Sequence, residues 1–228
     1  MMSSTYSIHY APPNTAHSGN EYHAPYYIVT LVFHDQSVNI TENIRKLNTK
    51  IINLNLPDHP IHTAPLIRRE YEYRGLSLHE RKCIFNALFN FARTVDIAYH
   101  PLIIEKKQLV DEIDLNIRIT KQLSNFLFTH LEYFMRFDHI MIYYDFGQME
   151  LTKILVSVFN TVLSNVDFKR VVPTEYRLFQ AADMLCTMEL LDLKAERKML
   201  SNSELSFFKS ARDLNKSYLK ALHGKKFK

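Results

Sequence analysis

A run of five apolar or aromatic residues, 140–144, ends directly on a carboxylate, Asp145, with Gly147 two residues later. An apolar run of this length bounded by turn residues is typical of a buried β-strand. In α/β sheets, functional residues gather where strands end at their carboxyl side. An ionised carboxylate there needs a partner or a metal, because burying it alone costs much free energy. Asp145 is therefore the first candidate functional residue.

Other segments show strand or helix periodicity. Residues 26–33 are continuously apolar, which predicts a strand buried on both faces. Further strands are predicted at residues 5–10, 95–105 and 166–172, and Pro101 either places the second of these at a sheet edge or marks a bulge in it. Helical spacing of apolar residues predicts helices over 39–54, 77–93, 108–135, 148–163, 176–195 and 203–222. Thr41 is a plausible N-cap, and Ser77 with Glu80 forms a capping box.

The order of these segments predicts the fold class. Strands come first and then alternate with helices, which favours an α/β fold with helices packed on a mixed sheet. Right-handed crossovers should make the later strands parallel. The 228 residues fit a single domain, 1–228, in which 196–228 form a C-terminal helical extension and basic tail. That tail is either a solvated end or a patch that contacts phosphate.

Composition excludes several classes of protein. The apolar fraction of 46% and charged fraction of 23% are those of an ordinary globular chain, and a net charge of +4 does not by itself indicate a nucleic-acid partner. The four glycines form no phosphate-binding loop, and no nucleophile elbow is present. Cys83 and Cys186 are expected to be buried free thiols. Without a signal peptide or a membrane-length apolar run, we expect a cytoplasmic protein with no membrane partner.

Asp183 is the second candidate carboxylate. It lies in an otherwise apolar helical segment, with Gln180 three residues earlier on a nearby face. Small residues at Ala181 and Ala182 indicate close approach to another element, for which the end of the strand that precedes Asp145 is the candidate. Two other interpretations stay open. Asp183 either faces solvent on a polar side of the helix or binds a backbone group.

His62 and the arginines that follow it are candidates for substrate contact. His62 is suited to orient a water or contact a phosphate, or it is a structural histidine in a proline-rich loop. His59 and His62 form an H-x-x-H pair, which needs two further ligands to hold zinc. Arg68 and Arg69 either bind phosphate or belong to a solvated run of charge.

These motifs together resemble those of the domain of unknown function 3800 family, which is RNase H-like. The family combines a first-strand D-E-S-G motif, an I-H-T segment and a late L-Q-x-A-D-L-L helix. This chain matches at the 26–33 strand, at Ile61-His62-Thr63, at Tyr-Tyr-Asp-x-Gly ending on Gly147, and at the helix carrying Gln180 and Asp183. The resemblance covers nearly the whole chain.

The resemblance implies an RNase H-like mixed five-stranded sheet flanked by helices, with an extra C-terminal helix. It implies that Asp145, Asp183 and His62 are catalytic and that both aspartates bind Mg²⁺ or Mn²⁺, cations that prefer oxygen ligands. Two metals about 4 Å apart would activate a water and stabilise the leaving oxygen. Arg68, Arg69 and Gln180 are then the expected substrate-binding residues. Family members resemble bacterial proteins of mobile elements or defence.

The chain departs from the family at the first motif. Ala11-Pro12-Pro13-Asn14 stands where the family has D-E-S-G, so Ala11 replaces the central metal-bridging aspartate. Alanine offers no ligand, and the nearby histidines suit Mg²⁺ poorly. Three interpretations stay open: a degenerate, non-catalytic member, an altered site with another metal, or a changed form of an active parent.

Two functions follow from these residues. The first is a divalent-metal-dependent nuclease or other nucleic-acid-processing protein, whose site is degenerate at Ala11. The second is a non-catalytic protein that keeps the fold and binds nucleic acid or a protein partner. Restoring an aspartate with Ala11→Asp separates the two. A hydrolase of unrelated α/β type is a third hypothesis, disfavoured by the missing nucleophile motif.

Overall fold

The computed structural model describes residues 5–11, 25–54, 60–144, 149–172 and 176–228, with the backbone alone for 5–11. Asp145 and His59, both named above as candidates, lie outside the described residues, as does the segment 12–14 that follows Ala11. No helix in the described ranges is both long and apolar enough to cross a membrane.

The described strands form one mixed sheet in the order β3-β2-β1-β4-β5. The central strand is β1 (Thr5–Ala11). On one side of it lies antiparallel β2 (Tyr26–Asp35), followed by β3 (Ala98–Glu105), which is antiparallel to β2. On the other side lie β4 (His139–Tyr144) and β5 (Val166–Arg170), both parallel to β1. The parallel arrangement predicted for the later strands is confirmed, so β1, β4 and β5 end at the same edge.

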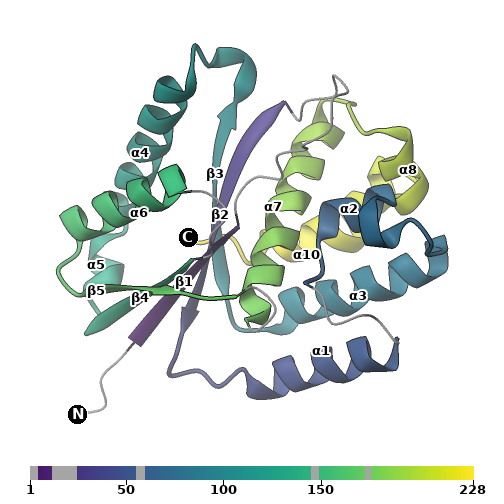
Figure 1. Ribbon diagram of the computed structural model, residues 1–228, viewed down its shortest axis with the longest axis horizontal. Helices are drawn as coiled ribbons and strands as arrows, with labels where there is room; N and C mark the ends of the chain where they lie inside the picture. The colour runs from purple at the N-terminus through teal and green to yellow at the C-terminus, as the bar shows by residue number, and fades with distance from the viewer. Residues whose placement is uncertain (1–4, 12–24, 55–59, 145–148, 173–175) are drawn as a thin grey trace.

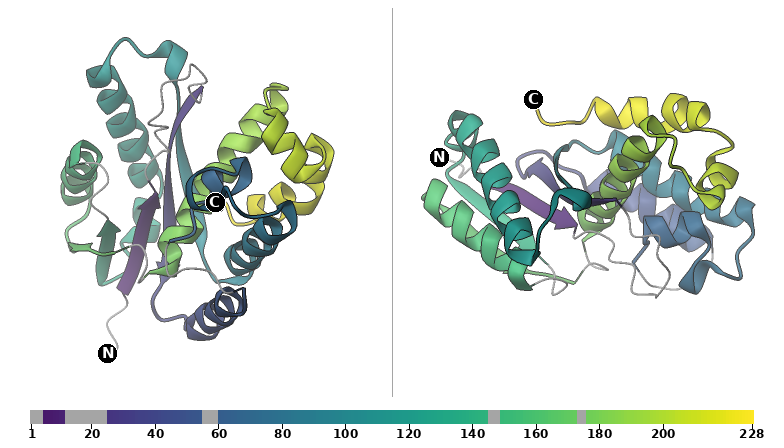
Figure 2. Two further views of the ribbon diagram at one scale, coloured as in Figure 1. Left: turned by 45° about the vertical axis from the view of Figure 1, so that its right-hand side comes forward. Right: turned by 90° about the horizontal axis from the view of Figure 1, so that it is seen from above.

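Helices cover the two faces of the sheet as separate layers (Figures 1 and 2). One layer is α4 (Glu112–Thr129), α5 (Leu131–Phe134) and α6 (Met149–Val162). The other is built from α1 (Thr41–Asn53), α2 (Thr63–Arg68), α3 (Leu78–Thr94) and α7 (Arg177–Glu196). Single-turn helices at Tyr71–Tyr73 and Lys106–Gln108 join these elements. Each face therefore has its own apolar core.

Local sequence signals explain several boundaries. The capping box is confirmed, because the Glu80 amide donates to Ser77 Oγ at 3.2 Å while the Ser77 amide donates to Glu80 Oε2 at 2.7 Å. Strand β2 is buried along nearly its whole length, as its continuous apolar run predicts. Pro101 does lie on an edge strand, where its missing N–H costs no ladder hydrogen bond.

Other boundaries differ from the prediction. The helix expected over 108–135 is broken at His130 into α4 and α5. Helix α1 begins at Thr41 itself, after Ile40, without a side-chain cap, so Thr41 is not the N-cap. Both cysteines are free as expected, but Cys83 is only half-buried, whereas Cys186 is buried.

The C-terminal extension is not one helix. It consists of α8 (Asn202–Phe208), α9 (Ala211–Leu214), the π-helical turn Asn215–Leu219 and α10 (Lys220–His223). Breaks fall at Lys209, which adopts a positive φ of 70°, and at Ser210, which caps α9. Each short helix packs on the α3 and α7 side of the molecule, where Figure 2 shows the yellow segment.

The basic tail docks against the sheet, so the interpretation as a solvated end is wrong, while contact with phosphate stays a prediction. The Tyr99 amide donates to the Lys225 carbonyl at 2.9 Å, and the Phe227 amide donates to the Tyr99 carbonyl at 2.8 Å. Lys226 pairs with buried Glu189 at 2.9 Å. The ring of Phe227 enters a group of aromatic side chains that includes Phe33. The tail thus extends the outer edge of β3.

The fold-class prediction needs correction. It expected an α/β, RNase H-like sheet flanked by helices with one extra C-terminal helix. In the described residues the strands are only 5 to 10 residues long, whereas α7 has 20 residues and α4 has 18. The described molecule is predominantly helical, because helices form both outer layers and the whole C-terminal region, so the predicted RNase H-like fold class is wrong.

Candidate functional site at the junction of two helices

Asp183 and His62, two of the three predicted catalytic residues, meet where α2 lies against α7. The amide of Thr63, the first residue of α2, donates to Asp183 Oδ2 at 2.8 Å. Burial raises the pKa of Asp183 above its ordinary value; the Thr63 hydrogen bond and the nearby His62 and Arg68 act in the opposite direction. The interpretation that Asp183 binds a backbone group is therefore confirmed.

The backbone at His62 and Thr63 is held from two sides. The His62 amide donates to the hydroxyl of Tyr73 at 3.0 Å, one residue before the amide that binds Asp183. Tyr73 is buried, and burial raises its pKa, so the phenol stays protonated at neutral pH. The His62 side chain itself is exposed. The structure thus fixes the main chain of His62 and leaves its imidazole at the surface beside Asp183.

Helix α2 is short and apolar, and its position depends on a buried arginine. Thr63 through Ile67 are buried. Arg81 of α3 is also buried, and its Nη1 donates to the carbonyls of Leu66 and Ile67 at 2.9 and 2.8 Å. These bonds satisfy carbonyl groups at the end of α2 that have no partner within so short a helix. The α2 backbone is therefore anchored at both ends, by Arg81 and by Asp183.

Gln180 lies one turn before Asp183 on α7. It is buried, and its Oε1 accepts a hydrogen bond from Arg177 Nη1 at 3.1 Å. Arg177 also donates from Nε to Asn48 of α1 at 2.8 Å. Gln180 Nε2 is buried and has no hydrogen-bond partner among the described residues. A buried amide donor of this kind is costly unless a ligand or water completes it.

The two predicted arginines lie in different surroundings. Arg68 is half-buried, forms an ion pair with Glu70 at 3.0 Å and is close enough to Asp183 to influence its pKa. Arg69 is exposed and donates from Nε to the Arg74 carbonyl at 2.9 Å, ending α2 in a left-handed conformation with φ of 63°. Arg68 therefore belongs to the junction, while Arg69 serves as the terminating residue of α2.

The carboxyl ends of the central strands lie at one edge of the sheet. Ala11 is the last residue of β1 and pairs with Thr30 of β2, and Tyr144 is the last residue of neighbouring β4. Asp145 is the next residue in the chain and lies outside the description. Helix α7, which carries Asp183, packs against β1 and β2. The described structure therefore places Asp183 on a helix that contacts the strand ending at Ala11.

The described residues supply only some of the ligands that a divalent-cation site at Asp183 would need. In these ranges, no three His, Cys, Asp or Glu side chains gather as a metal site. Asp183 supplies an oxygen ligand of the type that Mg²⁺ and Mn²⁺ prefer. The chemistry of Asp183 fits a divalent cation, provided that further ligands come from outside the described residues, Asp145 among them.

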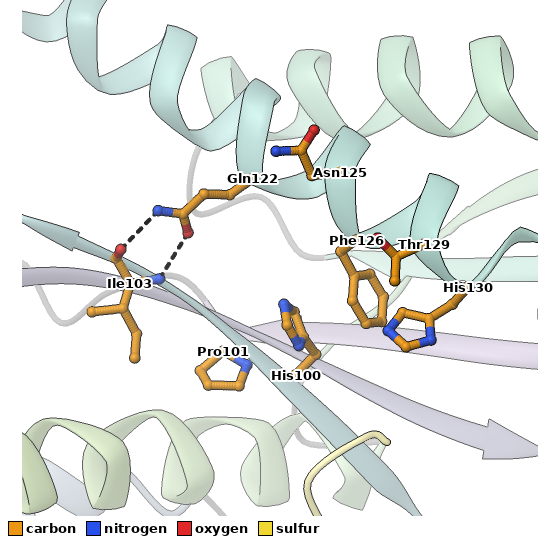
Figure 3. A pocket seen from close by; sticks show the side chains of 8 residues that line it. All are labelled: His100, Pro101, Ile103, Gln122, Asn125, Phe126, Thr129 and His130. Carbon is orange, nitrogen blue, oxygen red and sulfur yellow. Dashed lines mark hydrogen bonds between the residues drawn. The ribbon is translucent and has the colours of Figure 1, made fainter.

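A second feature escaped the sequence analysis. A groove of about 410 Å³ lies between β3 and α4, lined by His100, Pro101, Ile103, Gln122, Asn125, Phe126, Thr129 and His130 (Figure 3). His100 stacks on Phe126 with ring centroids 3.9 Å apart, and burial lowers the pKa of His100 to about 4. Apart from the edge proline, no sequence signal marks this groove. It contains none of the predicted site residues.

Comparison of the sequence with protein-family models and with curated proteins found no match. The function must therefore be argued from the site itself.

Proposed function

We propose that this protein binds nucleic acid at the junction of α2 and α7 and processes its phosphodiester bonds with the aid of a divalent cation, Mg²⁺ or Mn²⁺. The observation that carries the proposal is the meeting of Asp183 with the His62–Thr63 backbone, 120 positions away in sequence. Carboxylate, imidazole and guanidinium groups then stand together, which is the set that phosphodiester chemistry uses. The motif resemblance to the domain of unknown function 3800 family belongs to the same proposal, as does a cytoplasmic location.

Each residue of the junction has a role in this proposal. Asp183 holds the cation, and the Thr63 amide fixes the direction of its carboxylate. A bound cation would supply charge neutralisation at the phosphate. The exposed imidazole of His62 orients a water or accepts its proton, and Arg68 binds a phosphate oxygen. Gln180 Nε2 is a further donor, but the side chain is buried, so its partner would be a buried water and not the substrate itself.

A second candidate function is nucleic-acid or protein binding without catalysis. Ala11 carries no ligand at the end of β1, and within the described ranges no three ligating side chains gather. A site with too few ligands would keep its phosphate-binding groups while losing hydrolysis. Where the partner is nucleic acid, this candidate differs from the first only in the reaction, so a nuclease assay separates them.

Cleavage of labelled single- and double-stranded DNA and RNA tests the proposal, with Mn²⁺, with Mg²⁺ and with EDTA. We expect metal-dependent cleavage that Asp183→Asn and Asp145→Asn abolish. Glu132→Gln, the same loss of charge at an exposed position on α5, should leave it unchanged.

The Ala11→Asp variant distinguishes the two candidates in this assay. Cleavage by Ala11→Asp but not by the natural chain, with nucleic acid bound by both, would favour the non-catalytic function. A chain that neither cleaves nor binds any of the four substrates would contradict the first candidate and nucleic-acid binding in the second.

A further inference from the structure

Two tyrosines and a lysine form a small surface at the carboxyl end of β4. The rings of Tyr143 and Tyr176 lie 5.4 Å apart between centroids, at an interplanar angle of 39°. The Nζ atom of Lys169 lies 6.0 Å from both ring centroids. Tyr143 and Lys169 are paired neighbours on β4 and β5, and Tyr176 is the N-cap residue of α7. We call these three residues the tyrosine–lysine platform.

The platform lies on a part of the sheet that the described helices leave open. Side chains alternate along β4 and β5, so Ile142 and Phe168 pack in the core beneath α4 and α6 while Tyr143 and Lys169 point to the other face. On that other face α7 packs on β1 and β2, nearer the middle of the sheet. Both tyrosines are half-buried and Lys169 is exposed, so the rings present part of their surface to solvent.

The platform continues into the junction of α2 and α7. Tyr176, Gln180 and Asp183 follow one another at the helical spacing that puts residues on one side of α7. The platform therefore lies on the side of α7 that also carries Asp183, with buried Gln180 between them.

The geometry points to the tyrosine–lysine platform as a binding site for single-stranded nucleic acid, on which unpaired bases stack and Lys169 contacts the backbone phosphate. This inference rests on the proposed function and names the class of its substrate. Aromatic rings next to cations are the combination that binds single strands, because every base has a face that stacks and every nucleotide has a negative charge. In a duplex the bases stack on one another, so their faces are not available to the tyrosines.

Binding of fluorescently labelled oligonucleotides to the full chain, measured by anisotropy without divalent metal, tests this inference. A 12-nucleotide single strand is compared with the corresponding duplex. We expect the single strand to bind more tightly, and Tyr176→Leu to weaken its binding about tenfold, the effect of losing one stacked base. Tyr176→Phe keeps the ring and should bind like the natural chain. Circular dichroism melting checks that each variant is folded.

Lys169→Gln provides an independent readout. Removing one phosphate contact should reduce the slope of log Kd against log salt by about 0.7 for a single strand. Lys121→Gln removes an equal charge from the exposed side of α4 and should leave the slope unchanged.

The outcomes separate this inference from the proposed function. If the chain binds nucleic acid but Tyr176→Leu and Lys169→Gln bind single strands as tightly as the natural chain, the platform is overturned and the proposed function stands. Equal or tighter binding of the duplex overturns the preference for single strands. Absence of binding to both oligonucleotides overturns the platform together with the proposed function.

Discussion

Asp183 accepts a hydrogen bond from the backbone amide of Thr63 at 2.8 Å, which joins the late helix α7 to the short helix α2. The contact brings together two motifs that the sequence analysis treated as parts of one site. It also gives Asp183 a structural role, because the bond anchors the first turn of α2.

Asp183→Asn should stabilise the fold at neutral pH. Burial raises the pKa of Asp183, so the folded chain binds its proton more tightly than the unfolded chain, and stability decreases as the pH rises through the folded pKa. An amide keeps the hydrogen-bond acceptor for Thr63 without the charge. We expect the free energy of unfolding at pH 7 to rise by about 1 kcal/mol, the usual scale of stabilising substitutions.

Urea unfolding of the natural chain and Asp183→Asn at pH 7 and at pH 3.5 measures this effect. The advantage of the variant should shrink at the lower pH, where the natural carboxyl is protonated. A loss of stability at pH 7 in Asp183→Asn would show instead that the ionised carboxylate stabilises the junction.

His100 should make the fold sensitive to mild acid. Burial is the main cause that lowers its pKa to about 4, and His130 and Lys226 add to it. The unfolded imidazole has a pKa of about 6.5, so this contribution to stability is complete above that pH and is lost as the pH falls toward 4. His100→Phe keeps a ring stacked on Phe126 and should flatten the pH dependence of the urea midpoint over this range. His79→Asn, at an exposed histidine, should not. The same dependence of the urea midpoint on pH in the natural chain, His100→Phe and His79→Asn would contradict this account.

Phe227→Ala should destabilise the chain although the residue lies next to the C-terminus. The Phe227 ring lies within 6 Å, between centroids, of Phe33, Phe126, His130, Tyr133 and Phe134. Because Phe227 is half-buried, we expect a loss of about 2 kcal/mol, less than the 3–5 kcal/mol of a fully buried phenylalanine. Lys228→Ala, at an exposed neighbour, is the control. Identical melting of both variants and the natural chain would mean that the tail does not dock in solution.

Gln122 should stabilise the fold by hydrogen-bonding to the backbone at the outer edge of β3. Its Nε2 donates to the Ile103 carbonyl at 2.9 Å, and its Oε1 accepts from the Ile103 amide at 3.1 Å (Figure 3). Gln122→Met loses both bonds and should lower the free energy of unfolding by about 1–2 kcal/mol. Gln122→Glu keeps only the acceptor, so its melting temperature should lie between those of the natural chain and Gln122→Met. A Gln122→Met variant as stable as the natural chain would contradict this role.

Much of the secondary structure could be predicted from periodicity and from local signals. The capping box at Ser77, the apolar run of β2 and the edge proline at position 101 each act within a few residues, so the sequence reveals them directly. The break at His130 was missed because the apolar pattern continues through it. The capping role of Thr41 was wrong because Ile40 takes the N-cap position.

Contacts between distant segments could not be predicted in the same way. The docked tail depends on Glu189, on the Tyr99 backbone and on an aromatic group drawn from several elements, and no local pattern encodes that combination. At the candidate site, motif order paired His62 with Asp183, but the bond to the Thr63 amide depends on how α2 lies on α7. The approach of Tyr176, at the start of α7, to Tyr143 on β4 likewise joins residues that are distant in sequence.

The most direct test of the proposed metal-dependent site is thermal unfolding of the natural chain, Asp183→Asn and Glu132→Gln with and without Mn²⁺. A cation that binds only the folded state at a hundred times its Kd stabilises by about 2.7 kcal/mol, which is a rise in Tm of several degrees for a chain of this size. The account predicts that rise for the natural chain and for Glu132→Gln, and its loss in Asp183→Asn. No rise in the natural chain, or the same rise in Asp183→Asn, would contradict it.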